Sequence, residues 1–476
     1  MPPLVVGFDL DLTLLDSRAG IAVVMAALSA ETGVFINPSV VTSRLGPPVE
    51  TELSAWFPVE GVAAAAERYR ALYPDLAVAG APLLPGARDA VAAVHRHGGR
   101  VLVVTGKHEP NARLHLEHLG LEVDAVAGGR FGVAKAEVLA AEEAAIYVGD
   151  HPADVGAARA AGADSVAVAT GGTSAAQLTA AGADVVLADL TAFPAWLDAY
   201  VLDRRLDALD ASLRSLGSVL VAYSGGADSA FLLAAAVRAL GADRVVAATA
   251  VSDSLAGQEL APAARFAREL GVRHRTPRTQ EMAREGYRAN AGDRCWFCKA
   301  ELLDVLGPLA AELGLAAVAT GTNADDAVAG FRPGIRAAAE RGAVAPLRDA
   351  VLTKAQVRAA SRRWGLPTWD KPAAACLSSR IAYGVRITPY RLARVNRAEA
   401  GLRAALAAQG VPVGNLRVRD LGDRARVEVD AEHVGAVGER AVAAVRDAGF
   451  DAVEVDARGF RSGAMNELLA DPASYR

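Results

Sequence analysis

Six consecutive residues in the middle of the chain could form a binding site for a phosphate group. They separate the apolar run 219–222 from an apolar stretch that begins at Ala230, and they are Ser224, Gly225, Gly226, Ala227, Asp228 and Ser229. This pattern is typical of a strand, a glycine turn and a helix start. Backbone N–H groups at a helix N-terminus attract anions, and the helix dipole adds to that attraction. No Gly-Lys-Ser/Thr string follows, so the turn is not a Walker loop.

A second group of polar residues accompanies three short apolar runs, 4–8, 101–104 and 145–148. The polar residues that follow within a few positions of these runs are Asp9, Asp11, Thr105, Asp150 and Asp154, and Lys135 precedes the third run. The carboxyl ends of parallel strands meet at one edge of a sheet, so we expect these side chains to lie together. Carboxylates suit Mg²⁺, and a carboxylate can also attack phosphorus as a nucleophile.

Three cysteines form the third candidate group. Cys295 and Cys298 make a C-x-x-C pair at what reads as a helix start, and Cys376 lies in the string WDKPAAACLSSR. Two thiolates at this spacing can bind one metal centre or form a redox pair. Zinc normally takes four ligands, and three cysteines among 476 residues do not make a disulfide framework. We therefore expect metal or sulfur chemistry.

Strand-like and helix-like segments alternate around these residues. Further strands are expected at 244–250, 316–320, 416–419, 424–429 and 452–455, and helices at 202–216, 261–270 and 433–448. Such alternation predicts α/β domains with parallel sheets, followed here by a small α+β part. We expect domains at 1–200, 201–375 and 376–476. No Gly-, Ser- or Pro-rich linker marks the first boundary.

Composition narrows the classes of function. Hydrophobic residues make up 52% of the chain and charged residues 22%, as in a packed globular protein. The net charge of −5 gives no overall basic field for nucleic acid, although the last third carries local Arg clusters. The N-terminal string MPPLVVGFDLDLT is acidic where a signal peptide needs basic residues, and no uncharged run could span a bilayer. We expect a cytoplasmic protein without membrane contact.

The first 200 residues resemble the haloacid dehalogenase (HAD) phosphohydrolases. The resemblance rests on D-x-D-x-T, a strand-end Thr, a Lys and G-D-x-x-x-D in this order on one β/α pattern. It implies a Rossmann-like domain, and the Ala-rich residues from about 15 to 83 resemble the helical cap that closes over small phosphate esters. The composition of the cap does not identify the substrate.

The HAD resemblance also implies a role for each motif residue. Asp9 would attack phosphorus and form an aspartyl phosphate, and Asp11 would act as the general acid and then as the base. Thr105 and Lys135 would hold the phosphoryl oxygens. The ligands implied for Mg²⁺ are Asp9, the main chain of Asp11 and Asp150, with Asp154 supporting them.

The rest of the chain resembles a different family. The string S-G-G-x-D-S resembles the pyrophosphate loop of PP-loop ATPases, whose fold is that of the adenine nucleotide alpha hydrolases. Together with R-C-x-x-C-K, G-T-N-A-D-D, R-P-G, W-D-K-P and C-L-S-S-R, it resembles LarE, an ATP-dependent sulfur transferase of nickel-pincer nucleotide cofactor synthesis. The implied ATP-binding residues are Ser224, Gly225, Gly226, Asp228, Ser229 and Asp326.

The LarE resemblance implies a two-step reaction. The carboxylate of a pyridinium dicarboxylate mononucleotide would attack the α-phosphorus of ATP, and pyrophosphate would leave. Sulfur would then attack the acyl adenylate, giving a thiocarboxylate and AMP. Family members with only the cysteine that matches Cys376 sacrifice its sulfur, whereas those with a C-x-x-C resemble proteins that hold a 4Fe–4S cluster. With Cys295, Cys298 and Cys376 we expect the cluster, whose fourth iron would be open to sulfide.

The C-terminal part carries the residues implied for the acceptor. Arg417 and Arg419 match positions that the family uses for the substrate phosphate, and Arg is well suited to clamp phosphate. Arg380 is expected near the reacting carboxylate or AMP, and Glu428 matches an acidic position near the site. Asp420 stands where the family would have His.

Several alternatives remain open from the sequence. The PP-loop half could be a tRNA thiolase, or it could make an amide as NAD and GMP synthetases do. The HAD half could serve only for docking or regulation. Besides a small nucleotide substrate, we expect as partners a second copy of the chain or other proteins of nickel-pincer cofactor synthesis, rather than nucleic acid.

Overall fold

The computed structural model describes residues 3–328, 333–372, 375–461 and 464–465. It divides into two compact units, and the boundary in the sequence falls between Val201 and Leu202, inside helix α10 (Phe193–Leu216). The sequence predicts this helix only from Leu202. It begins earlier because Phe193 and Leu197 continue its apolar pattern and are buried in the core of the first unit. Arg332 of the R-P-G string, and most of the residues after Arg461, lie outside the described residues.

The first unit is built on a six-stranded parallel sheet with the order β3-β2-β1-β4-β5-β6. Its strands are β1 (Val5–Phe8), β2 (Arg100–Val104), β3 (Ala125–Ala127), β4 (Ile146–Gly149), β5 (Asp164–Val168) and β6 (Val185–Leu187). The order reverses beside β1, and ligands of open α/β sheets bind at such a point. The surrounding helices are α5 (Ala87–Arg96), α6 (Glu109–His118), α7 (Val133–Ala141), α8 (Pro152–Ala161) and α9 (Ala175–Ala180), and η1 (Leu190–Ala192) is a short 3₁₀ turn.

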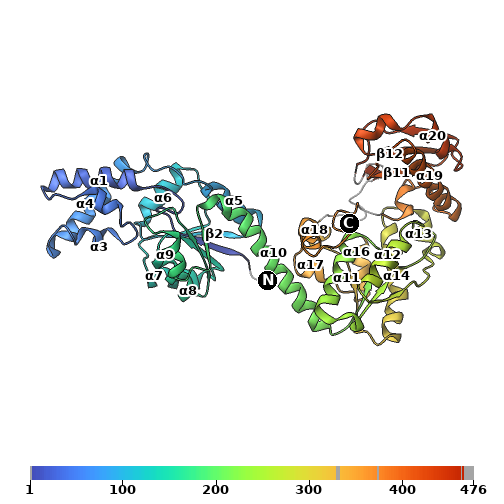
Figure 1. Ribbon diagram of the computed structural model, residues 1–476, viewed down its shortest axis with the longest axis horizontal. Coiled ribbons are helices and arrows are strands. Elements are labelled where there is room, and N and C mark those ends of the chain that lie inside the picture. Colours follow the sequence, from blue (N-terminus) through green and yellow to red (C-terminus); the bar gives the residue numbers. More distant parts are fainter. Residues whose placement is uncertain (1–2, 329–332, 373–374, 462–463, 466–476) are drawn as a thin grey trace. The chain divides into compact units, whose positions relative to one another are not determined.

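Four helices between β1 and α5 form a cap with its own apolar core. They are α1 (Arg18–Thr32), α2 (Pro38–Thr42), α3 (Val49–Leu53) and α4 (Val59–Ala77). Figure 1 shows α1, α3 and α4 gathered beside the α/β part of this unit. Their buried apolar residues, among them Val24, Leu28 and Tyr73, form a cluster separate from that of the sheet. The cap can therefore pack as a small body of its own.

The second unit contains a four-stranded parallel sheet with the order β10-β7-β8-β9. Its strands are β7 (Val219–Ala222), β8 (Val245–Ala248), β9 (Arg273–Arg275) and β10 (Ala317–Thr320). The helices are α11 (Ala227–Leu240), α12 (Leu260–Glu269), α13 (Glu285–Ala289), α14 (Arg294–Glu312), α15 (Ala324–Val328), α16 (Pro333–Glu340), α17 (Pro346–Asp349) and α18 (Lys354–Arg363), with the 3₁₀ turns η2 (Ala242–Arg244) and η3 (Glu281–Ala283). The parallel α/β architecture expected from the sequence is confirmed.

The C-terminal part of this unit is a three-stranded sheet with helices. Strands β11 (Leu416–Asp420) and β12 (Arg424–Val429) form the expected antiparallel hairpin, and β13 (Ala452–Val455) pairs parallel to β12. The helical elements are η4 (Leu377–Arg380), α19 (Pro389–Ala407), η5 (Ala431–Ala436) and α20 (Glu439–Arg446). None of the helices in the described residues is long and apolar enough to cross a membrane.

One sequence prediction in this part is wrong. The expected continuous helix at 433–448 is split into η5 and α20. Glycine is a poor helix former because it loses the most backbone freedom on folding, and Gly435 and Gly438 lie at the break.

Asp420 joins the C-terminal sheet to α19. Its carboxylate is fully buried and accepts from Arg391 Nη1 at 2.7 Å and from Arg394 Nη2 at 2.6 Å. Two guanidinium groups supply the charge that a buried carboxylate needs. An acidic side chain at the position where His was expected is therefore explained by its structural role.

We predict that Asp420→Asn lowers the free energy of unfolding of the second unit by about 3 kcal/mol, because it leaves two buried or half-buried cations without their counter-charge. Denaturant unfolding measures the change. Asp423→Asn, an exposed position on the same hairpin, is the control and should lie within about 0.5 kcal/mol of the native chain. Equal stability of the two variants would contradict the structural role.

Candidate active sites

Three aspartates meet at the carboxyl edge of the first sheet. Asp9 follows β1, Asp150 follows β4, and Asp154 lies in the first turn of α8. Each offers a carboxylate oxygen, and these oxygens all lie within 4.8 Å of one another. All three side chains are buried. The structure thus brings together the carboxylates that the sequence placed at this edge.

The side chain of Lys135 extends from helix α7 into this group of carboxylates. Its Nζ atom donates to Asp9 Oδ1 at 2.8 Å and to Asp154 Oδ1 at 2.7 Å. One ammonium group does not balance three buried carboxylates. Burial, and after it the neighbouring carboxylates, raise the pKa of Asp150 to about 8. Burial likewise raises the pKa of Asp9 to about 6, although Lys135 opposes the rise.

This donor set fits a divalent cation. Three oxygen ligands with excess negative charge are what Mg²⁺ prefers. Gly171 leaves room for the carboxylate of Asp150 because it has no side chain. A Cβ atom at position 171 would lie only 1.8 Å from Asp150 Oδ2. Asp9, Asp150 and Asp154 would hold the ion, which would neutralise charge on a phosphoryl group. The side chain of Asp11 is not part of this triad. The HAD resemblance implies only its main chain as a ligand of Mg²⁺.

Asp11 faces the cap instead. Its Oδ1 atom lies 2.9 Å from Lys107 Nζ, which also donates to the hydroxyl of Tyr73 at 2.6 Å. That hydroxyl lies 2.9 Å from Nε2 of His115 on α6. Tyr73 belongs to cap helix α4, so this chain of contacts ties the cap to the residue expected to act as general acid. Thr105 is buried at the end of β2, where its Oγ1 accepts from the backbone N–H of Lys107 at 3.2 Å.

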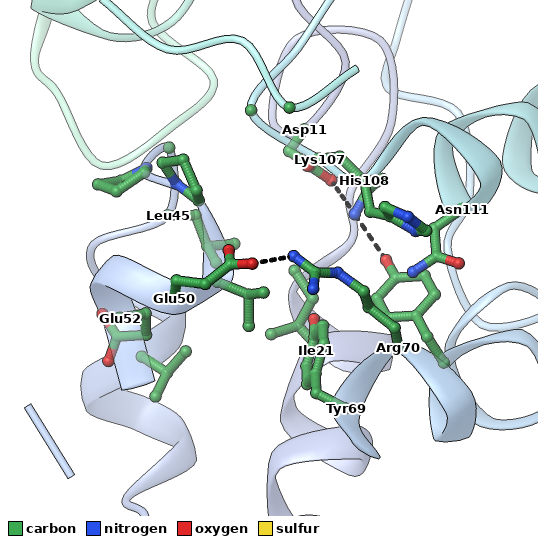
Figure 2. A pocket seen from close by; sticks show the side chains of 18 of the residues that line it. Asp11, Ile21, Leu45, Glu50, Glu52, Tyr69, Arg70, Lys107, His108 and Asn111 are labelled. Carbon is green, nitrogen blue, oxygen red and sulfur yellow. Dashed lines mark hydrogen bonds and ion pairs between the residues drawn. The ribbon is translucent and has the colours of Figure 1, made fainter. Parts of the chain in front are cut away.

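A cavity of about 230 Å³ opens beside Asp11 between the cap and the sheet domain. Figure 2 shows Asp11 and Lys107 at one end of it, and Glu50 of α3 reaching toward Arg70 of α4 across it. Glu50 and Arg70 form an ion pair. The apolar part of the lining includes Ile21, Met25, Val41, Leu45 and Val49. This cavity could thus take a small ester group of mixed polarity whose phosphate lies near Asp9.

In the second unit, residues 224–229 comprise the end of the turn after β7 and the first turn of α11. Gly225 has φ +77°, a conformation that favours glycine. The hydroxyl of Ser229 accepts from the backbone N–H of Ser224 at 3.3 Å and donates to the carbonyl of Gly226 at 3.1 Å. The helix begins at Ala227, with Gly226 as its N-cap, three residues before the apolar stretch that the sequence offered as the helix start. The side chains of both serines are therefore used to shape the turn.

A cavity of about 670 Å³ lies over this turn. Ser224, Gly226, Asp228 and Ser229 line it, and so does Asp326 of α15. Burial, and after it Asp326, raise the pKa of Asp228, so two carboxylates face this space together. Cationic groups in the lining are Lys299, Lys354, Arg358 and Lys371. The volume lies within the range usual for small-molecule sites, and its mixture of cations, carboxylates and helix N–H groups suits a nucleotide with Mg²⁺.

The same cavity ends next to two of the cysteines. Lys299 and Ala375 form part of its wall, and they directly follow Cys298 and directly precede Cys376. Burial, followed by the charges of Cys376, Glu281 and Cys295, raises the pKa of the Cys298 thiol. The three cysteines are therefore electrostatic neighbours. Cys295 and Cys376 are exposed, and Cys298 is half-buried.

The spacing of the three sulfur atoms bears on which metal group they could hold. Their sulfur atoms are not within 4.8 Å of one another, the limit met among the described residues by the three aspartates. Sulfurs bound to one zinc at about 2.3 Å would lie closer than that limit. A 4Fe–4S cluster spreads its cysteines over a larger body and accepts three of them. Cys295, Cys298 and Cys376 would hold it, and it would present an iron site to sulfur.

Three arginines lie close together behind Cys376. Arg380 forms an ion pair with Glu399 at 2.9 Å, and its Nη1 donates to the carbonyl of Cys376, also at 2.9 Å. Arg419 pairs with Glu428 at 2.7 Å and donates to the carbonyl of Ser379 at 3.2 Å. Burial, and after it Arg380, lower the pKa of Arg417 to about 10. Such a concentration of buried cations is suited to a phosphate.

Comparison with known proteins assigns the two units. The haloacid dehalogenase-like hydrolase model matches residues 6–159. An uncharacterised protein of Synechocystis (slr1717) is 42% identical over 275 residues, covering 56% of this chain and 99% of the relative. The pyridinium-3,5-bisthiocarboxylic acid mononucleotide synthase of Lactiplantibacillus plantarum is 35% identical over 264 residues, covering 55% of this chain and 93% of that enzyme. The chain belongs to the LarE family. Its LarE region is C-terminal, and its N-terminal part is a HAD hydrolase domain.

The HAD domain also has a relative with a different name. The tyrosine-protein kinase PtkA of Mycobacterium tuberculosis is 33% identical over 183 residues, which cover 36% of this chain and 63% of the kinase.

Sequence reasoning missed the residues that support these sites. Lys107 was visible after Thr105, but its contact with Asp11 depends on the cap. Lys371 of W-D-K-P donates to the carbonyl of Gly225 at 2.9 Å and pairs with Glu259 at 2.7 Å, so the segment before Cys376 contacts the LarE phosphate turn. A cation in a motif next to a glycine turn is the signal that could have indicated this contact.

The His115 contact predicts a pH dependence for the HAD domain. Burial, and after it Lys107, lower the pKa of His115 to about 4, below its usual 6.5. Because the pKa of His115 is lower in the folded state, burial of the neutral ring costs no stability above pH 6.5. The stability of the fold then decreases as the pH falls from 6.5 through 4. We expect a loss of up to about 2 kcal/mol across that window.

Thermal melts from neutral to acidic pH measure this loss. His115→Gln, which cannot be protonated, should flatten that part of the profile. His118→Gln at an exposed position of the same helix should change it far less, because the charge of His118 is the smallest of the causes that act on the pKa of His115. Identical profiles for the native chain and His115→Gln would refute the assignment.

Proposed function

We propose that the second unit activates a carboxylate with ATP and replaces one of its oxygens by sulfur, and that the first unit hydrolyses a phosphate monoester. The L. plantarum relative is named as the synthase of pyridinium-3,5-bisthiocarboxylic acid mononucleotide, so we propose a pyridinium dicarboxylate mononucleotide as the acceptor. The observation that carries this proposal is that Lys299 and Ala375, the chain neighbours of Cys298 and Cys376, line the cavity over residues 224–229.

The adenylation step is derived from the cavity lining. Backbone N–H groups and the N-terminus of α11 would hold the ATP phosphates, and Asp228 and Asp326 would hold their Mg²⁺. The acceptor carboxylate oxygen forms a bond to the α-phosphorus, and pyrophosphate leaves. AMP is then a good leaving group, whereas a carboxylate oxygen is a poor one. Arg417 and Arg419 would hold the phosphate of the acceptor, and Arg380 would hold the loop of Cys376.

The sulfur source is the finer part of the proposal. A cluster on Cys295, Cys298 and Cys376 would supply sulfide from its open iron site. Sulfur then forms a bond to the acyl carbon, and AMP departs with the electron pair. The alternative source is the sulfur of Cys376 itself, which would leave dehydroalanine after one transfer.

In the first unit, Asp9 would attack phosphorus, and Asp11 would give a proton to the departing oxygen. Lys135 would neutralise a phosphoryl oxygen beside Asp9, as its 2.8 Å contact with the carboxylate suggests. The cavity of about 230 Å³ is smaller than the usual range of about 300–1,000 Å³ for drug-sized ligands. Its size favours a small leaving group over a nucleoside. The reason for joining this unit to a LarE unit could still be the removal of a phosphate ester of the same pathway.

We predict that Asp9→Asn lowers phosphate release by about a thousandfold or more, because it removes the nucleophile. Formation of AMP and pyrophosphate should stay unchanged, since these arise in the other unit. The assay follows phosphate from phosphoglycolate, AMP and pyridine mononucleotides with Mg²⁺, and Asp75→Asn, an exposed cap position, is the control. Unchanged phosphate release by Asp9→Asn would refute the hydrolase mechanism.

The same protein preparation also tests whether this unit has the tyrosine kinase activity that the name of the mycobacterial relative indicates. Incubation with γ-labelled ATP and a tyrosine peptide should leave the peptide unlabelled if the unit is a hydrolase. Label on the peptide that is lost in Asp9→Asn would instead favour a kinase.

A second prediction separates the two sulfur sources. If the cluster supplies sulfide, Cys295→Ala should lose bound iron and fall to at most one turnover per chain, while the native chain turns over repeatedly. Anaerobic iron and sulfide analysis, together with thiocarboxylate, AMP and pyrophosphate measured on the mononucleotide, decides this. Cys376→Ala should be inactive with either source. Many turnovers by Cys295→Ala would exclude the cluster.

The assay also separates the competing classes. Pyrophosphate exchange that requires tRNA would favour a tRNA thiolase, and product formation that requires ammonia would favour an amide-forming synthetase. We expect exchange with the mononucleotide alone.

A further inference from the structure

A buried arginine begins the helix that carries two of the cysteines. Arg294 is the first residue of α14, directly precedes Cys295, and is only 5% exposed. Its Nη1 atom donates to Asn290 Oδ1 at 2.6 Å and to the carbonyl oxygen of Ser378 at 2.9 Å. Both acceptors are neutral and fully buried. Within the described residues, no carboxylate forms an ion pair with this guanidinium.

A buried cation without a carboxylate requires another source of negative charge. The ionisable groups that act on its charge include the thiols of Cys295 and Cys376 and the hydroxyl of Tyr383, whose ring centre lies 5.5 Å from the guanidinium carbon. The surroundings of Arg294 are thus suited to anionic sulfur.

The guanidinium also joins two segments that are far apart in the sequence. Ser378 stands two residues after Cys376, so one arginine contacts the main chain beside one cysteine and adjoins another. Asn290 extends the connection, because its Nδ2 donates to the carbonyls of Ala382 at 2.7 Å and Val385 at 2.9 Å. Asn290 adopts φ +55°, a left-handed conformation that Asn tolerates better than most residues.

Further bonds run parallel to this connection. The hydroxyl of Tyr287 bonds to that of Ser378, the N–H of Gly384 donates to the carbonyl of Asn290 at 3.2 Å, and that of Ile387 donates to the carbonyl of Arg288 at 2.9 Å. The stretch before the C-x-x-C pair is therefore bonded along its length to the stretch after Cys376. Arg294 is the charged member of this network.

We propose that Arg294 is a positioning residue of the sulfur centre: its two hydrogen bonds hold the Cys376 segment against the start of α14, and its charge balances the sulfur ligands. This inference rests on the proposed sulfur transfer and adds to it a residue that neither holds ATP nor supplies sulfur. Lysine cannot replace arginine fully, because its ammonium group retains the charge but lies one bond nearer to the backbone than Nη1, the atom that makes both bonds.

The two roles can be measured separately in the full chain. Position is tested without iron, in a Cys295→Ala background, by the rate at which dibromobimane cross-links Cys298 to Cys376. Both Arg294→Met and Arg294→Lys should slow this rate by about tenfold, since neither side chain places a donor as far from the backbone as Nη1. Charge is tested with all three cysteines and a reconstituted cluster. Arg294→Met should shift the midpoint potential to more negative values, and Arg294→Lys should keep it near that of the native chain.

Arg288→Met is the matched control, because the side chain of this half-buried arginine of the adjacent α13 pairs, among the described residues, with Glu285 and not with the Cys376 segment. It should change neither readout. Native cross-linking rates in an Arg294→Met chain that still shows an ATP-induced rise in melting temperature would overturn the proposal. If Arg294→Met does not fold, a native cross-linking rate in Arg294→Lys overturns it instead.

Failure of the proposed function is distinguishable from failure of this inference. A native chain that forms no AMP with the mononucleotide would refute the sulfur transfer, whereas the cross-linking rates would still report whether Arg294 positions the cysteines.

Discussion

A charge that is removed from water needs an opposite charge or a set of hydrogen bonds, and this constraint organises each site of the chain. Lys135 lies among three buried aspartates whose combined charge exceeds its own. Asp420 lies between two arginines that satisfy it. Arg294 has only neutral partners and two thiols nearby. The carboxylates around Lys135 and the guanidinium of Arg294 lack enough opposite charge, and both lie where chemistry is proposed, whereas the carboxylate of Asp420 is fully compensated by two arginines and is structural.

The two units use the same part of a parallel sheet in different ways. In the first, side chains at the carboxyl ends of β1 and β4 provide the charge, and the backbone contributes room, as at Gly171. In the second, the turn after β7 supplies backbone N–H groups, and its serine hydroxyls shape the turn. Carboxylates suit a metal ion and a nucleophile, whereas N–H groups suit a phosphate that must later depart. The same edge can therefore favour attack on phosphorus in one unit and binding of phosphate in the other.

Sequence patterns predicted those features that depend on local spacing. Strand ends could be located from apolar runs of four or five residues, and so could the polar residues at the sheet edges. Features that depend on tertiary contacts could not. Lys107 contacts both Asp11 and Tyr73 of the cap, which lies far away in the sequence. The acidic residue at position 420 of β11 is explained only by its ion pairs with Arg391 and Arg394 of helix α19. The break between η5 and α20 had a local signal in two glycines, which the apolar pattern obscured.

Helix α10 limits how this chain can be divided. Its first part, with Phe193 and Leu197, is buried in the core of the first unit, and its later part, with Leu209 and Leu213, is buried in the core of the second. A cut between Val201 and Leu202 would sever a continuous helix and leave each fragment with a short helical end. Isolated helices of that length are marginal in water, so either fragment would keep its end folded only through its own core. Fragments that overlap across the whole of α10 are therefore the appropriate way to study each unit alone.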